Sequence, residues 1–178
     1  MHDPATLAQA VRSTEPLLTR FLDGFDDDTR IRTASGLPNH ASWTLGHLAI
    51  THHRAADVVL GFNEPQHLPT EDWVHGDGTA GDPSRYDTES VSYGSKPVDD
   101  PKRYPRWVRS MEIHKKAYDK LFEAVAQASP KQLEREVKWG GSIISAGDLV
   151  TRMLFHTGTH AGQLIDLRRA LGMPRVVG

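Results

Sequence analysis

Residues 146–172 read AGDLVTRMLFHTGTHAGQLIDLRRALG, and this stretch predicts one long amphipathic helix. Its apolar residues recur at spacings of three, four and seven, which is the period of an α-helix. Ser145, three residues before Asp148, resembles a capping box, and Gly172 with Pro174 ends the pattern. We therefore predict a helix over 146–171, whose apolar stripe comprises Leu149, Met153, Leu164, Leu167 and Leu171.

Two histidines occupy positions of that stripe where leucine would ordinarily lie. His156 and His160 are four residues apart, so they share one helix face on adjacent turns. Burying two imidazoles together is costly, because each has a donor and an acceptor nitrogen to satisfy and two like charges repel. A divalent cation would remove both costs, since neutral imidazole is a good metal ligand. The alternative is a pair of core histidines that are hydrogen-bonded to neighbours. Thr157 follows His156, so this is not the HExxH motif and lacks its general base.

Three further stretches carry helical periodicity, at residues 5–25, 40–61 and 104–128. Asn39 is the expected N-cap of the second, because it follows the breaker Gly36-Leu37-Pro38. No alternating strand series competes with these helices. Together with the helix at 146–171, they predict an all-α fold, a four-helix bundle in one domain over residues 1–178, with a long crossover connection between the second and third helices.

The connections between the helices differ in kind. Residues 129–144 predict a short helical turn at Ser129-Pro130 and a small hairpin around Gly140-Gly141. Residues 63–103 are rich in proline and glycine and are far longer than an ordinary loop. This long irregular connection is either a surface excursion or a segment that closes over a site, as an active-site lid, or over a partner subunit, as a dimer contact.

The composition excludes several classes of function. The chain of 178 residues has 21 Lys and Arg against 23 Asp and Glu, for a formal charge of −2, which does not favour nucleic acid or anionic membranes as partners. It has no cysteine, which excludes disulfides, thiolate zinc sites and a protein thiol nucleophile. No apolar stretch approaches the roughly 20 residues of a membrane span, and the start MHDPATLAQA does not resemble a signal peptide. We expect a cytoplasmic protein.

A third metal ligand would have to come from another helix. His47 lies about two turns into the second predicted helix, beside its apolar stripe, and Thr51 lies one turn further on. His52 and His53 point away from His47 by more than a quarter turn, so we expect both to be solvated. His40 is interpreted as no more than a helix-start residue.

His114 lies on the apolar stripe of the third predicted helix and has three possible roles. It could be a fourth ligand, a hydrogen-bond donor to a ligand, or an ordinary buried histidine. No Asp or Glu lies one turn from a proposed ligand on its inward face, so a general base is not visible. Thr51, His114 and Gln163 are the candidates for orienting water or substrate.

Two runs of the sequence belong together in this respect. The first is Trp43…Gly46-His47-Leu48, and the second is His156-x-x-x-His160-x-Gly162-Gln163-Leu164, followed by Leu167-Arg168-Arg169. Both runs resemble the DinB/YfiT-like superfamily of metalloenzymes. The resemblance extends from the first helix to Gly172, and the middle connection is longer than is typical. It implies an all-α bundle, often a homodimer, with a three-histidine site for nickel, zinc or a similar divalent metal such as Fe²⁺ or Mn²⁺. The ligands that it carries over are His47, His156 and His160.

Relatives in this superfamily include thiol-dependent S-transferases and isomerases, so the resemblance implies a small-molecule substrate and possible use of a low-molecular-weight thiol. We therefore expect a mononuclear metal-dependent enzyme, either an S-transferase or isomerase or a hydrolase. The alternative is a non-catalytic bundle with a structural metal or a small-ligand binding role. A di-iron bundle is a poor third option, because it needs two inward Glu-x-x-His pairs and the sequence offers only Glu64…His67, beside Pro65.

Overall fold

Four long helices dominate the computed structural model, which describes residues 2–62, 67–76 and 81–176. They are α1 (Pro4–Leu22), α2 (Ala41–Leu60), α4 (Trp107–Gln127) and α6 (Ala146–Ala170). The four predicted helices are confirmed, with no boundary displaced by more than three residues. Within the described ranges, no helix is both long and apolar enough to cross a membrane.

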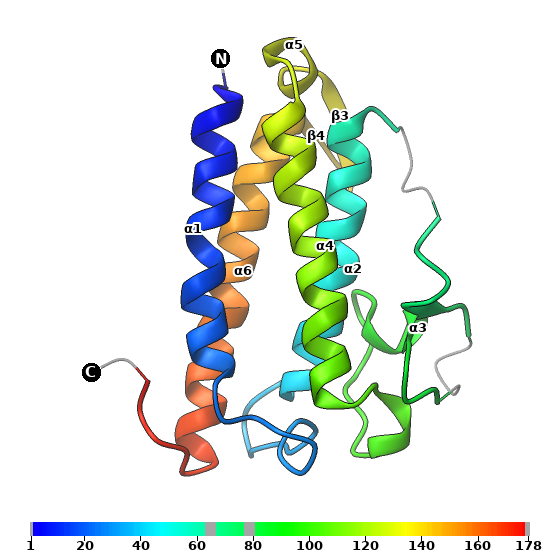
Figure 1. Cartoon of the computed structure of the whole chain (residues 1–178), viewed down its shortest axis with the longest axis vertical. Helices are drawn as coiled ribbons and strands as arrows, with labels where there is room; N and C mark the ends of the chain where they lie inside the picture. The colour runs from blue at the N-terminus through cyan, green and yellow to red at the C-terminus, as the bar shows by residue number, and fades with distance from the viewer. Residues whose placement is uncertain (1, 63–66, 77–80, 177–178) are drawn as a thin grey trace.

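Each long helix packs against two of the others. α1 contacts α4 and α6, and α2 contacts the same two helices, which closes a four-helix bundle. The core between them is apolar, and each fully buried leucine stabilises the fold by about 1.5–3 kcal/mol. Examples from the four helices are Leu18, Leu48, Leu121 and Leu149. Figure 1 shows that α2 and α4 run in the same direction and that α1 and α6 run the opposite way.

Because α2 and α4 are parallel, the chain between them has to return along the length of the bundle (Figure 1). This connecting segment includes short elements: β1 (Trp73–Val74), β2 (Tyr86–Asp87), α3 (Thr88–Val91) and the 3₁₀ helix η1 (Pro101–Arg103). The strands β1 and β2 pair in parallel, with Trp73 opposite Tyr86. Residues 63–66 and 77–80 of the predicted connection, Glu64 among them, lie outside the described residues.

The connecting segment packs directly on α2. Tyr86 and Val91 are fully buried, and the Tyr86 hydroxyl donates a hydrogen bond to the carbonyl of Ser42 over 2.8 Å. Gly46 permits this approach, because a Cβ there would lie 2.6 Å from the Tyr86 ring and 2.8 Å from the Val91 side chain. Of the residues in α2, all but Thr51, Arg54 and Leu60 are buried.

The expectation that His52 and His53 are solvated is therefore wrong. Both side chains are buried, because α2 is covered by the connecting segment as well as by α4 and α6. His52 Nε2 lies 3.0 Å from the hydroxyl of Thr157, and Lys120 donates to His53 Nε2 over 2.8 Å. An amphipathic pattern assumes one solvent-facing side, and α2 has almost none.

The helix caps agree with those predicted from the sequence, except at the start of α2. His40, not Asn39, is the N-cap of α2, and its Nδ1 accepts a hydrogen bond from the Trp43 amide over 3.1 Å. Ser145 caps α6 by accepting from the amide of Asp148.

The connection before α6 confirms the predicted turn and hairpin. The short helix α5 (Pro130–Leu133) starts at a capping box formed by Ser129 and Gln132. Strands β3 (Glu136–Trp139) and β4 (Ser142–Ser145) pair antiparallel. Gly140 and Gly141 form the tight turn between them with positive φ angles, which glycine adopts at low cost.

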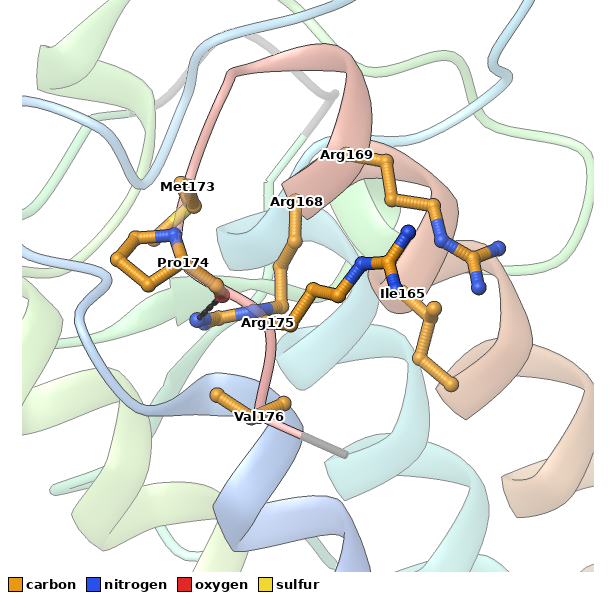
Figure 2. A pocket seen from close by; sticks show the side chains of 7 residues that line it. All are labelled: Ile165, Arg168, Arg169, Met173, Pro174, Arg175 and Val176. Carbon is orange, nitrogen blue, oxygen red and sulfur yellow. Dashed lines mark hydrogen bonds between the residues drawn. The ribbon is translucent and has the colours of Figure 1, made fainter. Parts of the chain in front are cut away.

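At the far end of α6, the C-terminal residues fold back over the last helical turn and enclose a cavity of about 260 Å³ (Figure 2). Arg168 is buried there and donates hydrogen bonds to the carbonyls of Pro174 at 2.9 Å and Phe21 at 3.3 Å. It also donates to the carbonyl of Asp23. The guanidinium therefore joins the chain after α6 to the end of α1. The described residues that line this cavity include no histidine.

Candidate metal centre

Three histidines from two helices converge inside the bundle. His47 comes from α2, and His156 and His160 come from adjacent turns of α6. His156 Nε2 lies 3.2 Å from His47 Nε2 and 3.1 Å from His160 Nε2. One ring nitrogen from each histidine thus lies within 4.8 Å of the other two, which is a group that could hold a metal ion.

Partners on the far side of two rings determine which nitrogen faces this centre. His47 Nδ1 lies 2.8 Å from the carbonyl of Val91, and His160 Nδ1 lies 2.8 Å from Gln163 Oε1. Because both oxygens can only accept, each Nδ1 carries the proton and each Nε2 presents a lone pair. Gln163 Oε1 also accepts from Asn39 Nδ2 over 3.1 Å, which fixes the orientation of its amide.

Burial keeps all three imidazoles neutral near pH 7. It lowers the pKa of His156 to about 4, with a further contribution from His47. The pKa of His160 is also lowered to about 4, by burial and then by the two neighbouring histidines, against the opposing effect of its hydrogen bond to Gln163 Oε1. The pKa of His47 is lowered by burial in spite of its bond to Val91, and the charge of Arg54 lowers it further. Neutral imidazole is the form that binds a metal.

The hydrogen-bonding capacity of the centre is incomplete without a cation. The lone pairs on Nε2 of His47 and of His160 both face His156, which can place at most one proton on its own Nε2. His156 Nδ1 is buried and has no hydrogen-bond partner among the described residues. A metal ion would satisfy all three Nε2 lone pairs at once, and no arrangement of protons on these rings does so.

One side of the centre opens into a cavity of about 740 Å³. His47 and His156 line it, and His156 is half-buried whereas His160 is buried. The remaining walls come from parts of the chain that are distant in sequence, namely α2, the turn after α3, α6 and the β3–β4 hairpin. A volume of this size suits a small organic ligand.

The residues proposed to orient water or substrate lie in different places. Thr51 lines the cavity, and its hydroxyl donates to the carbonyl of His47 over 2.6 Å. Gln163 lies behind His160 and positions that ring. His114 is buried apart from the centre, with its ring centroid 5.7 Å from that of His52 and 6.1 Å from that of Tyr118.

Sequence reasoning missed two contributions to the centre. The carbonyl of Val91 carries no side-chain signal, so no pattern could have found it. Trp43 stacks on His47, with ring centroids 4.7 Å apart and planes at 10°, and its indole donates to the hydroxyl of Ser95. The spacing of four residues between Trp43 and His47 could have suggested this stacking.

Comparison with known proteins agrees with this architecture. The family model of the DinB superfamily matches residues 10–164. YfiT from Bacillus subtilis, described as a "probable metal-dependent hydrolase with an unusual four-helix bundle topology", superimposes with a TM-score of 0.63 at 13% sequence identity. The alignment covers 96% of this chain and 89% of YfiT, and at this identity it shows a shared fold. A search of curated protein sequences gives no significant match. The family match over most of the chain establishes that this protein belongs to the DinB superfamily.

Proposed function

We propose that the chain is a mononuclear enzyme that depends on a divalent metal and acts on a small molecule. Its metal ligands are the Nε2 atoms of His47, His156 and His160, and the preferred ions are Zn²⁺ or Ni²⁺, followed by Fe²⁺ or Mn²⁺. The observation that carries the proposal is the meeting of three imidazoles, two of which line a cavity of about 740 Å³. The shared fold of YfiT, which is described as a "probable metal-dependent hydrolase", supports it.

The distances between the nitrogen atoms suit one ion. Tetrahedral zinc with Zn–N bonds of about 2.1 Å places its ligand nitrogens about 3.4 Å apart. His156 Nε2 lies 3.2 and 3.1 Å from the other two, and all three nitrogens lie within 4.8 Å of one another, so side-chain movements can bring them to this spacing.

The ion would supply Lewis acidity to a carbonyl, a water or a thiol that enters from the cavity. The protein side chains hold and orient what enters. The Thr51 hydroxyl donates to the backbone, so its remaining lone pair can accept a hydrogen bond from water or a thiol. No Asp or Glu is among the described residues that line the cavity, so a carboxylate base is not part of the proposal.

The reaction is proposed to be thiol-dependent S-transfer or isomerisation, or hydrolysis. The chain has no cysteine, so a thiol would enter as a low-molecular-weight cosubstrate. Hydrolysis needs only water and the same centre. Assays with small thiols and electrophilic acceptors, beside assays with ester and amide substrates, separate the two reactions.

A structural metal in a non-catalytic bundle is the competing function. A structural zinc site is closed by four protein ligands. Among the described residues the group has three members, and its open side meets the cavity. This arrangement favours a reactive ion over a structural one.

Elemental analysis tests the metal site directly. We expect about one divalent ion per chain in the purified protein and loss of that ion in His156→Ala. Equal metal content in both proteins, or no uptake after incubation with Zn²⁺ or Ni²⁺, would contradict the proposal. We also propose a homodimer, which light scattering on the purified protein tests independently.

A further inference from the structure

Two cationic side chains reach the cavity beside the histidine centre. Arg54 lies on α2, two turns beyond His47 on the same face, and is half-buried. Lys138 comes from β3 and lines the same cavity. Within the described part of the chain, neither has an ion-pair or hydrogen-bond partner. Two other half-buried cations do have one: Arg109 binds Asp72, and Lys120 binds Asp57.

The rest of the described lining offers these two cations no compensating charge. It contains no Asp or Glu, and its apolar part includes Val58, Trp139 and Met153. A partly buried guanidinium loses interactions with water, and without a counter-ion no protein group compensates for that loss. The arrangement therefore suits a ligand with an anionic group on an apolar body.

Arginine is the side chain suited to this recognition. Its planar guanidinium binds a carboxylate or a phosphate through two parallel hydrogen bonds, which fixes orientation as well as charge. Arg54 and His47 lie two turns apart on the same face of α2, and both line the cavity together with His156. An anion bound at Arg54 would therefore place the rest of a small molecule along the wall that leads to His47 and His156.

We propose that the cavity binds a small organic acid, with its carboxylate or phosphate on Arg54 and Lys138 and its apolar body against Val58, Trp139 and Met153. The reacting end would then face His47 and His156, and this orientation rests on the metal-dependent function proposed above. Anion binding itself depends only on the two cations and the cavity.

Matched probes that differ in charge test this inference. Titration calorimetry compares 4-phenylbutanoate with its neutral amide, and 3-phenylpropyl phosphate distinguishes phosphate from carboxylate recognition. We expect the wild-type protein to prefer at least one anionic probe over the amide by about tenfold or more, which is the size of a hydrogen bond to a charged group. Arg54→Gln should abolish the preference, and Lys138→Gln should reduce it less, because Lys138 is exposed.

Arg20→Gln is the matched control, because it removes the same charge from an exposed residue of α1, away from the cavity. It should leave the preference unchanged. Equal affinity for the anionic and neutral probes, no measurable binding of any probe, or an unchanged preference in Arg54→Gln would overturn the inference.

The same titrations on EDTA-treated protein separate this inference from the proposed function. A preference that persists without metal and disappears in Arg54→Gln supports the inference even if the protein never binds an ion. A preference that is lost with the metal and is insensitive to Arg54→Gln belongs to the ion and overturns the inference. Metal content should be equal in wild type and Arg54→Gln, because Arg54 is not a ligand.

Discussion

Two groups of buried or half-buried histidines lie within one bundle, and only one of them brings three ring nitrogens together. His47, His156 and His160 direct three Nε2 atoms at one another beside a cavity. His52 and His114 are also buried and face one another across α2 and α4, with ring centroids 5.7 Å apart. Burial and histidine content are common to both groups, so neither property makes a metal site.

The difference lies in what each nitrogen contacts. In the centre, the oxygens of Val91 and Gln163 accept hydrogen bonds from the Nδ1 atoms of His47 and His160. The Nε2 lone pairs of these two rings therefore point toward the same place. In the other pair, His52 Nε2 contacts the hydroxyl of Thr157, while His52 Nδ1 and His114 Nε2 are buried and have no hydrogen-bond partner in the described part of the chain. Hydrogen-bond acceptors thus orient two of the three rings of the candidate centre, which is the difference between it and the other buried pair.

The largest expected effect comes from removing one histidine of each group. His160→Ala should reduce metal affinity by well over the 10–100-fold that is typical of losing an outer hydrogen bond, because it deletes a ligand. His114→Leu should retain the affinity of the wild type. Competition with a chromophoric chelator measures both. The comparison fails if the two variants lose metal to the same extent.

The second prediction concerns acid stability of the metal-free protein. Burial lowers the pKa of folded His114 to about 4, whereas an unfolded histidine titrates near 6.5. Between these pH values the unfolded chain binds the extra proton, so His114 does not affect stability above about pH 6.5 and destabilises the fold progressively as the pH falls to 4. The full loss is on the order of 3 kcal/mol.

Urea unfolding at several pH values between 7 and 4 checks this effect. In His114→Leu, the unfolding free energy should fall less steeply as the pH decreases. The change in slope corresponds to the uptake of up to one proton fewer on unfolding. At pH 7 it should be close to neutral, because it replaces a buried nitrogen that has no partner. An unchanged slope in the variant would show that folded His114 takes up its proton near pH 6.5.

The third prediction tests the orienting partner of His160. Gln163→Leu removes the acceptor of the Nδ1 proton, so the ring can turn and its Nε2 is no longer held toward the centre. We expect metal affinity to fall by about 10–100-fold. Asn39→Ala, which removes only the bond to Gln163, should have a smaller effect. Equal affinity in wild type and Gln163→Leu would show that packing alone orients the ring.

The fourth prediction tests how the connecting segment supports the centre. Gly46→Ala places a Cβ too close to Tyr86 and Val91, so the segment must move away from α2. We expect a loss of about 1–3 kcal/mol in unfolding free energy, as for other overpacked sites. Because Val91 also holds His47, metal affinity should fall as well. Gly158→Ala is the control, because a Cβ there meets no atom within 4 Å.

The sequence predicts the four long helices well because their apolar spacing is regular. The helix expected over 146–171 occupies Ala146–Ala170, and the hairpin follows from Gly140-Gly141. The same periodicity brings His156 and His160 to one face, and their position on the stripe correctly indicates burial for His160.

What the sequence could not predict depends on contacts between distant segments. The stretch between α2 and α4 lacks apolar periodicity, so its packing through Tyr86 and Val91 was not visible, and neither was the burial of His53 beside Pro69 and Trp73. The cavity likewise combines Arg54 with Lys138, which are separated by nearly half of the chain and line one cavity only after folding.

Anomalous diffraction at the zinc edge from crystals of the zinc-loaded protein tests the central claim most directly. We predict one strong peak at about 2.1 Å from Nε2 of His47, His156 and His160, facing the cavity. A peak at other side chains, or none after loading, would contradict the account.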